Sequence, residues 1–207
     1  MKKTIICNIP MRERIAKVVY SSEDQSLPVS EKAFRFPINS FLSQTLNPED
    51  EVRVILLAKR DDNKFTQDHV ENYQNEIKEV CETYGIKSEI IIIDTAFTQN
   101  KETHEHLMGK IIDEIEEDSH ILVDITYGPK DLPVVIFSAL GFAEKFLRCN
   151  VDNIVYGQAK FDKKTDEVVG SVICDMIPLY YLSSVTNTIK CDEPEKARQM
   201  LKSLLSL

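Results

Sequence analysis

The sequence predicts an α/β protein with a mostly parallel β-sheet and helices on both faces. Short apolar runs, typical of strands buried on both faces, alternate with segments whose apolar residues recur at helical spacing. This alternation favours a parallel sheet with right-handed crossovers. The last two predicted strands are joined by the polar link 162–166, which is too short for a crossover helix, so these strands are expected to be antiparallel.

The N-terminal part of the chain predicts a strand, a hairpin and a short helix. The strand is expected over residues 4–9, and Pro10 ends it. Residues 17–21 and 32–36 each alternate in polarity on either side of a polar segment, which predicts a small hairpin inserted after the first strand. A short helix is expected next, over residues 38–46.

The middle of the chain predicts two strands, each followed by a helix. The strands are expected over residues 52–58 and 89–93. Gly85 follows the first helix at the position of a C-cap. The buried face of that helix is predicted to carry Val70, Tyr73, Ile77, Cys81 and Tyr84. The apolar face of the second helix is predicted to carry Leu107, Met108, Ile111, Ile112 and Ile115.

The C-terminal part predicts three strands and three helices. Strands are expected over 120–125, 153–161 and 168–177, and helices over 132–146 and 179–189. Asp192 is expected to cap a last helix, with Pro194 in its first turn. The apolar stripe of that helix consists of Ala197, Met200, Leu201, Leu204 and Leu205. A stripe of this kind favours a partner surface.

Composition excludes several classes of protein. The chain has 25 Lys and Arg against 34 Asp and Glu, a net charge of −9, so its surface repels DNA and anionic membranes. The five cysteines form no CxxC pair and are odd in number, which indicates reduced thiols in a cytoplasmic protein. No export signal or membrane span is expected. The absence of GxGxxG argues against a nicotinamide dehydrogenase, and no cofactor is expected.

No metal site is expected either. His104 and His106 stand two apart on a predicted helix, so their side chains point in different directions, and no HExxH spacing follows. This segment is interpreted as a solvated helix start.

The strongest functional signal is the run Asp-Ile-Thr-Tyr-Gly-Pro-Lys-Asp-Leu-Pro at residues 124–133. A buried strand ends there and a helix begins, with Pro133 in the first turn. Free N–H groups at a helix start suit an anion, Gly128 permits close approach to the backbone, and Lys130 adds a positive charge. Asp124 is expected to accept backbone N–H groups of the turn, and Asp175 to do the same before the next helix.

Other polar residues are expected at the same edge of the sheet, because ligands of open parallel sheets bind beyond the carboxyl ends of the strands. They are Asn8, Met11, Arg12 and Arg14 after the first strand, Lys59 and Arg60 after the second, and Gln158 and Lys160 on the fifth. For any one of these cations a solvated loop position is the better explanation. The spacing of Thr126, Gly128 and Lys130 favours a binding site instead.

The 124–133 run, read as Asp-hydrophobic-Thr-aromatic-Gly-x-basic-x-Leu-Pro, resembles the CRISPR-associated Rossmann fold (CARF) family. In the branch concerned, His more often precedes the glycine, so Tyr127 departs from the pattern. Residues 34–37, 154–157 and 174–179 are also similar to segments of that branch. The resemblance covers roughly residues 1–190 and implies a Rossmann-like fold.

The resemblance implies a homodimeric sensor of cyclic oligoadenylate in type III CRISPR antiviral signalling, with cyclic tetra-adenylate as the first expected ligand. Residues 1–190 would form the ligand-binding domain, and the helix in 191–207 would be a dimer contact or a junction to a fused or separate effector. The expected ligand-binding residues are Asn8, Ile9, Pro10, Met11, Arg12, Thr126, Tyr127, Gly128, Pro129, Lys130 and Gln158. Val134, Phe137 and Phe142, outside the main stripe of their helix, would face the second subunit or the core.

Two enzyme hypotheses stay open beside the sensor. A ring nuclease would cleave the cyclic ligand slowly and without metal, by attack of a ribose 2′-hydroxyl that leaves 2′,3′-cyclic phosphate ends. Its catalytic residues would be Lys130 and Thr126. A small-molecule enzyme on a flavodoxin-like sheet is the other hypothesis, and the missing phosphate fingerprint argues against it.

Overall fold

The computed structural model of the chain describes residues 1–22, 27–59, 64–95, 100–161 and 168–205. Contacts divide the chain into two compact units, Met1–Ile177 and Pro178–Leu207. The expected domain boundary at 190/191 falls inside the second unit. None of the helices in the described ranges is long and apolar enough to cross a membrane.

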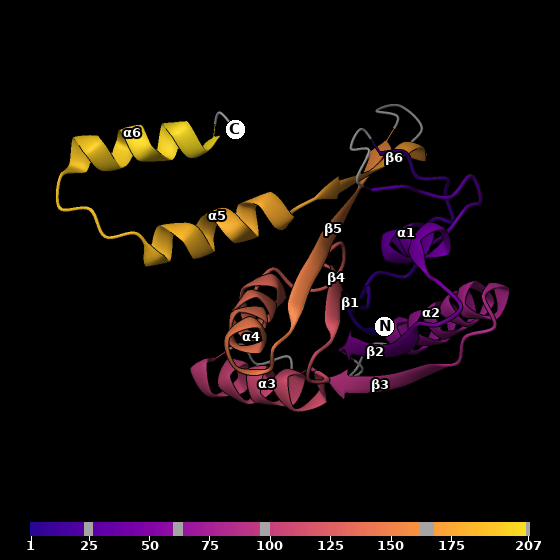
Figure 1. Cartoon of the computed structure of the whole chain (residues 1–207). Coiled ribbons are helices and arrows are strands. Elements are labelled where there is room, and N and C mark those ends of the chain that lie inside the picture. Colours follow the sequence, from indigo (N-terminus) through magenta and orange to yellow (C-terminus); the bar gives the residue numbers. More distant parts are fainter. Residues whose placement is uncertain (23–26, 60–63, 96–99, 162–167, 206–207) are drawn as a thin grey trace. The chain divides into compact units, whose positions relative to one another are not determined.

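The first unit is built on a six-stranded sheet with the order β3-β2-β1-β4-β5-β6 (Figure 1). Its strands are β1 (Lys2–Asn8), β2 (Glu51–Ala58), β3 (Ser88–Asp94), β4 (His120–Asp124), β5 (Asn150–Phe161) and β6 (Val168–Asp175). All neighbouring strands are parallel except β5 and β6, which are antiparallel. The structure therefore confirms the predicted mostly parallel α/β fold with its antiparallel pair.

Helices cover both faces of the sheet (Figure 1). They are α1 (Pro37–Thr45), α2 (Lys64–Thr83), α3 (Lys101–Glu114) and α4 (Leu132–Phe146). The alternating side chains of the strands explain this arrangement, because Ile5 and Cys7 join the core beneath α1 and α2, whereas the buried Ile6 points to the opposite face. Gly85 follows α2 with a φ of +69°, as expected of a C-cap.

The predicted hairpin after β1 is reduced to a single antiparallel bridge between Val18 and Phe34. The reason lies in a long-range pairing, since Ser21 leaves the hairpin register and bridges Val172 of β6 in parallel. We call residues 11–22 the strap. It crosses from the end of β1 to the free edge of β6.

The second unit contains most of α5 (Ile177–Thr188) and all of α6 (Pro194–Leu205). The strand predicted over 168–177 ends at Asp175, because the Asp175 carboxylate accepts the Ile177 N–H at 2.9 Å and starts a helix there. α6 begins at Pro194, so Glu193, rather than the predicted Asp192, precedes it. No residue of α6 is buried, and Met200, Leu201, Leu204 and Leu205 are exposed.

The strand order reverses between β1 and β4. These two strands are parallel, with Cys7 opposite Asp124, so their carboxyl ends bring Asn8 and the 125–131 turn to one place. Ligands of open α/β sheets bind at such a reversal.

Candidate functional site

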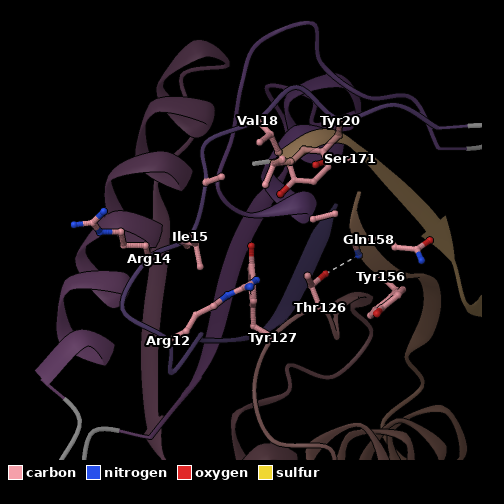
Figure 2. Close-up of a pocket in the computed structure, with 14 residues that line it drawn as sticks. Arg12, Arg14, Ile15, Val18, Tyr20, Thr126, Tyr127, Tyr156, Gln158 and Ser171 are labelled. Carbon is pink, nitrogen blue, oxygen red and sulfur yellow. Dashed lines mark hydrogen bonds between the residues drawn. The ribbon is translucent and has the colours of Figure 1, made fainter. Parts of the chain in front are cut away.

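A cavity of about 670 Å³ lies between the strap, the turn after β4 and the strands β5 and β6 (Figure 2). Its lining residues are Arg12, Arg14, Ile15, Ala16, Val18, Tyr20, Thr126, Tyr127, Tyr156, Gly157, Gln158, Ala159, Val168 and Ser171. Cations, aromatic rings and small polar groups are therefore combined in one space.

Four of the predicted ligand-binding residues line this cavity, namely Arg12, Thr126, Tyr127 and Gln158. The Arg12 guanidinium lies over the Tyr127 ring, with its central carbon 5.6 Å from the ring centroid (Figure 2). A cation held on an aromatic face is already oriented, and it remains free to bind an anion through its N–H groups.

The other predicted residues lie around the cavity without lining it. Asn8, Ile9 and Pro10 are buried, and Met11 is half-buried. Gly128 packs on Asn8, where an added Cβ would be 3.2 Å from the Asn8 Cβ. Both polar side-chain atoms of Asn8 lack a hydrogen-bond partner among the described residues.

Pro129 and Lys130 lie on the turn outside the cavity lining, with Lys130 exposed. Among the basic residues expected at this edge, Lys59 is buried and Lys160 is exposed on β5 without lining the cavity. Arg14 contributes to the lining, but its guanidinium points away from the other side chains (Figure 2). Arg60 lies outside the described residues.

Asp124 anchors the turn, as the sequence predicted. Its fully buried carboxylate accepts the Thr126 N–H at 2.8 Å and the Ile38 N–H, at the start of α1, at 3.2 Å. Burial raises the pKa of Asp124 to about 6, although hydrogen bonds from Thr126 and Ile38 oppose that rise. The Thr126 hydroxyl in turn accepts the Gly157 N–H at 2.7 Å, which joins the turn to β5 (Figure 2).

A second buried carboxylate, Glu76 of α2, holds the other wall of the cavity. It accepts the backbone N–H of Arg35 at 3.0 Å and that of Phe36 at 3.4 Å. The carbonyl oxygen of Arg35 then accepts the hydroxyls of Tyr127, at 2.9 Å, and Tyr20, at 3.1 Å. Burial raises the pKa of both tyrosines, that of Tyr127 to about 12, so both hydroxyls stay neutral.

Sequence reasoning missed the residues that the strap and β6 bring to the cavity. Tyr20 and Ser171 meet there because the Ser21 N–H donates to the Ser171 carbonyl at 2.9 Å. No local pattern signals a contact between segments so distant in the chain. Tyr156 and Gly157 stand next to Gln158 on β5. Alternation along the strand puts Tyr156 on the same face as Gln158, so Tyr156 could have been found from the sequence.

The His104 segment is not simply a solvated helix start. His104 is half-buried, and its Nε2 lies 2.9 Å from Asp131, the residue that precedes α4. Within the described residues no group of three His, Cys, Asp or Glu side chains could hold a metal ion.

A family model described as the CARF domain of the CRISPR system endoribonuclease Csx1 matches residues 6–160. A comparison with curated proteins finds no match. The matched range covers well over half of the chain and includes the 124–131 turn, the whole strap and the cavity-lining residues of β5. It ends before β6 and before both helices of the second unit.

Proposed function

The chain belongs to the CARF domain family, a CRISPR-associated family that senses oligoadenylates, and from this premise we propose that it binds cyclic oligoadenylate in the cavity beside the 124–131 turn. Cyclic tetra-adenylate is the first ligand to test. The supporting observation is the convergence of Arg12, Thr126, Tyr127 and Gln158 on one cavity.

The chemistry of the cavity suits a nucleotide. The Arg12 guanidinium offers a planar fork of N–H groups to phosphate oxygens. The rings of Tyr127 and Tyr156 offer faces and edges to an adenine base, and the Gln158 amide can both donate to and accept from its polar edge. The acidic surface of the chain repels polyanions elsewhere, so this cluster gives local selectivity.

We propose that the binding form is a homodimer that shares one ring. A two-fold dimer presents the same patch twice, which matches the two-fold symmetry of a tetra-adenylate ring. The exposed face of α4 is the proposed contact, because Val134 is 68% and Phe146 64% exposed. A hollow of about 340 Å³ lined in part by Met108, Val134 and Val135 lies on the same side.

Native mass spectrometry with cyclic tri-, tetra- and hexa-adenylate tests this function. We expect a complex of two chains and one tetra-adenylate ring, with affinity that falls as salt rises because exposed phosphate contacts are screened. Absence of binding to all three rings, or one ring on each monomer, would contradict the proposal.

A ring nuclease is the second candidate. The Arg12 guanidinium in the cavity could stabilise the charge that develops when a ribose 2′-hydroxyl attacks the neighbouring phosphate. Lys130 and Thr126 are its proposed catalytic residues. No His is among the described residues that line the cavity, and a site without a tuned acid or base forgoes roughly a 10²–10⁴-fold rate gain.

Cleavage is therefore expected to be slow and independent of metal. Chromatography of the incubated ring with and without EDTA measures it. Products that end in 2′,3′-cyclic phosphate in both samples would establish the nuclease, whereas an intact ring after a day would leave a sensor alone.

The matched family carries the name of an endoribonuclease, and the match covers its CARF domain. We therefore propose that ligand binding acts on a ribonuclease effector, either fused to this chain or separate. The exposed stripes of α5 and α6 are candidate contacts for that effector or for a second copy of this chain.

A further inference from the structure

The strap and the strands β5 and β6 enclose one end of the cavity. Ser21 fixes the strap to β6, because its N–H donates to the Ser171 carbonyl at 2.9 Å and its hydroxyl donates to the same oxygen at 3.1 Å. Figure 2 shows Tyr20 and Ser171 at the end of the cavity that lies away from Arg12. We call this end the slot, and its lining residues are Val18, Tyr20, Ala159 and Ser171.

The strand side of the slot is open because β5 carries small residues there. Ala159 lies opposite Ser171 in the antiparallel ladder, so both side chains are on one face of the sheet. Gly157, two residues before Ala159, is on the same face and has no side chain. The space between this part of the sheet and the strap therefore belongs to the cavity, which both residues line.

Ser171 brings an unpaired polar group to the slot. The residue is 4% exposed, and its Oγ has no hydrogen-bond partner among the described residues. Its backbone carbonyl, in contrast, accepts both hydrogen bonds from Ser21. Native proteins pair nearly all of their buried polar groups, since a buried hydroxyl without a partner costs free energy. An unpaired hydroxyl on a cavity-lining residue therefore points to a ligand that completes it.

The chemistry of the slot suits a base better than a phosphate. Val18 and Ala159 offer apolar walls, and Tyr20 offers an aromatic ring whose hydroxyl already donates to the Arg35 carbonyl at 3.1 Å. A phosphate in the slot would lose its water without meeting a cation, because Arg12 lies at the other end. A purine ring gains from apolar and aromatic walls, and a hydroxyl can donate to or accept from its polar edge.

We propose that the slot takes one purine base of the bound nucleotide, and that Ser171 is a specificity-determining residue whose hydroxyl pairs with the polar edge of that base. This inference rests on the proposed function for the identity of the ligand. The base then lies between the strap and β6 while Arg12 binds a phosphate at the other end of the cavity. The family match ends at residue 160, before β6, so the match itself does not assign this contact.

The first experiment compares affinity and stability in Ser171→Ala. Isothermal titration with cyclic tetra-adenylate should show roughly ten-fold weaker binding, because the polar edge of the base is left unpaired. The urea midpoint of the ligand-free variant should be unchanged or higher, since the hydroxyl bonds to no described group of the fold. A lower midpoint would mean that the hydroxyl serves the fold, and it would overturn the proposal.

Ser43→Ala is the matched control for the loss of a hydroxyl. The Ser43 hydroxyl donates to the Ser40 carbonyl at 2.8 Å, and the residue does not line this cavity. Its loss should lower the urea midpoint and leave the affinity for the ring unchanged, which is the reverse of the pattern expected for Ser171. The same loss of affinity in both variants would overturn the role of Ser171.

The second experiment changes the volume of the slot at a single position. Ala159→Leu should fill the space and weaken ring binding by more than roughly ten-fold. Ala159→Gly leaves the space open and should bind like the wild type. Equal losses in the two variants would show that the strand rather than the space matters, and they would overturn the slot.

The third experiment uses adenosine 5′-monophosphate, which carries one base and one phosphate and needs no ring. NMR titration should shift the Ser171 amide in the wild type and not in Ala159→Leu. Such shifts without binding of any cyclic oligoadenylate would support the slot and refute the proposed function. Equal ring affinity in the wild type, Ser171→Ala and Ala159→Leu would refute the slot alone. A chain that responds to neither ligand would refute both.

Discussion

The Nε2 atom of His69 lies 2.7 Å from the carbonyl oxygen of Arg12, so helix α2 holds the backbone of the strap where it supplies a guanidinium to the cavity. A carbonyl oxygen only accepts, and Nε2 therefore carries the proton. His69 is 4% exposed, and its Nδ1 has no hydrogen-bond partner among the described residues. Among the described residues, the hydrogen bond to Arg12 is therefore the one that the His69 ring makes.

Replacing His69 by Leu should release the strap from α2. The Arg12 carbonyl would lose its donor, and we expect a loss of about 1–3 kcal/mol in the free energy of unfolding together with weaker ring binding. Urea unfolding and ligand titration measure the two effects. Gln67→Leu, at an exposed position on the same helix, is the control, and equal effects of both substitutions would contradict this role for His69.

Arg12→Ala should weaken the binding of cyclic tetra-adenylate by about 1–3 kcal/mol, the range of a charge-assisted hydrogen bond. Lys130→Ala should also weaken it, if the ring extends from the cavity to the exposed turn. Lys101→Ala, on α3, removes the same charge and should have no effect. Isothermal titration of the three variants would show whether position or bulk charge matters, and three equal losses would mean bulk charge alone.

Gly157→Ala should destabilise the fold, since an added Cβ would collide with Pro37 Cγ and lie 3.3 Å from Thr126 Cγ2. Overpacking of this kind costs about 1–3 kcal/mol. Gly109→Ala is the matched control, because nothing lies within 4 Å of its Cβ and α3 should gain about 0.5–1 kcal/mol. Urea unfolding of both variants tests the difference in sign.

The chain should be a dimer without ligand, because α4 exposes the large apolar side chains of Val134 and Phe146. Sedimentation at low micromolar concentration measures this, and Val134→Glu should yield monomers. If Leu201→Glu on α6 dissociates the dimer instead, the contact lies in the second unit. A monomeric wild type would refute an interface that forms before the ligand binds.

Stability should rise as the pH falls from about 7 to 5. Asp124 has a folded-state pKa of about 6, above its ordinary value of 3.8, so the folded state binds a proton in a range where the unfolded state does not. The ionised carboxylate costs on the order of 3 kcal/mol at neutral pH, and that cost falls progressively as the pH drops from the folded-state pKa of about 6 to the ordinary value of 3.8.

Asp50 acts in the opposite direction at lower pH. Burial raises the pKa of Asp50, but its hydrogen bonds with Lys3, Asn47 and the N-terminal amine lower the pKa by more. The ionised Asp50 carboxylate therefore stabilises the fold throughout the range from pH 7 to 5, and this stabilisation is lost only at lower pH. Urea unfolding at several pH values should show a rise for the wild type and a flat profile for Asp124→Asn. A wild type that loses stability between pH 7 and 5 would contradict this reading of Asp124.

Helices and strands that are marked by a local sequence pattern could be predicted from the sequence. The stripe around Tyr73 and Ile77 predicted α2, and the short link after residue 161 predicted the antiparallel pair. The bond from Asp124 to the turn was also predictable, because an aspartate at the end of a strand commonly accepts N–H groups of the residues that follow it, as it does from Thr126. Its second bond, from the Ile38 N–H, joins residues far apart in the chain and has no local signal.

Long-range pairings were not predictable. Alternation near residues 18 and 34 predicted a hairpin. In the structure, the hydrogen bonds between Ser21 and β6 set the path of the strap instead. The cavity wall therefore depends on a contact across most of the chain. For the same reason, Lys130 seemed the principal cation in the sequence, whereas the structure places Arg12 in the cavity.

The bridge at Ser21 has a consequence for the solubility of the protein. β6 ends the sheet, and the unpaired N–H and C=O groups of such a strand are a template for another chain. Ser21 occupies part of that template, since its N–H donates to Ser171 at 2.9 Å and its carbonyl accepts from Ile173 at 2.8 Å. The strap also carries Arg12, so substitutions that loosen the strap should weaken ligand binding and promote aggregation together. Selection against aggregation then limits which substitutions the cavity wall can accept.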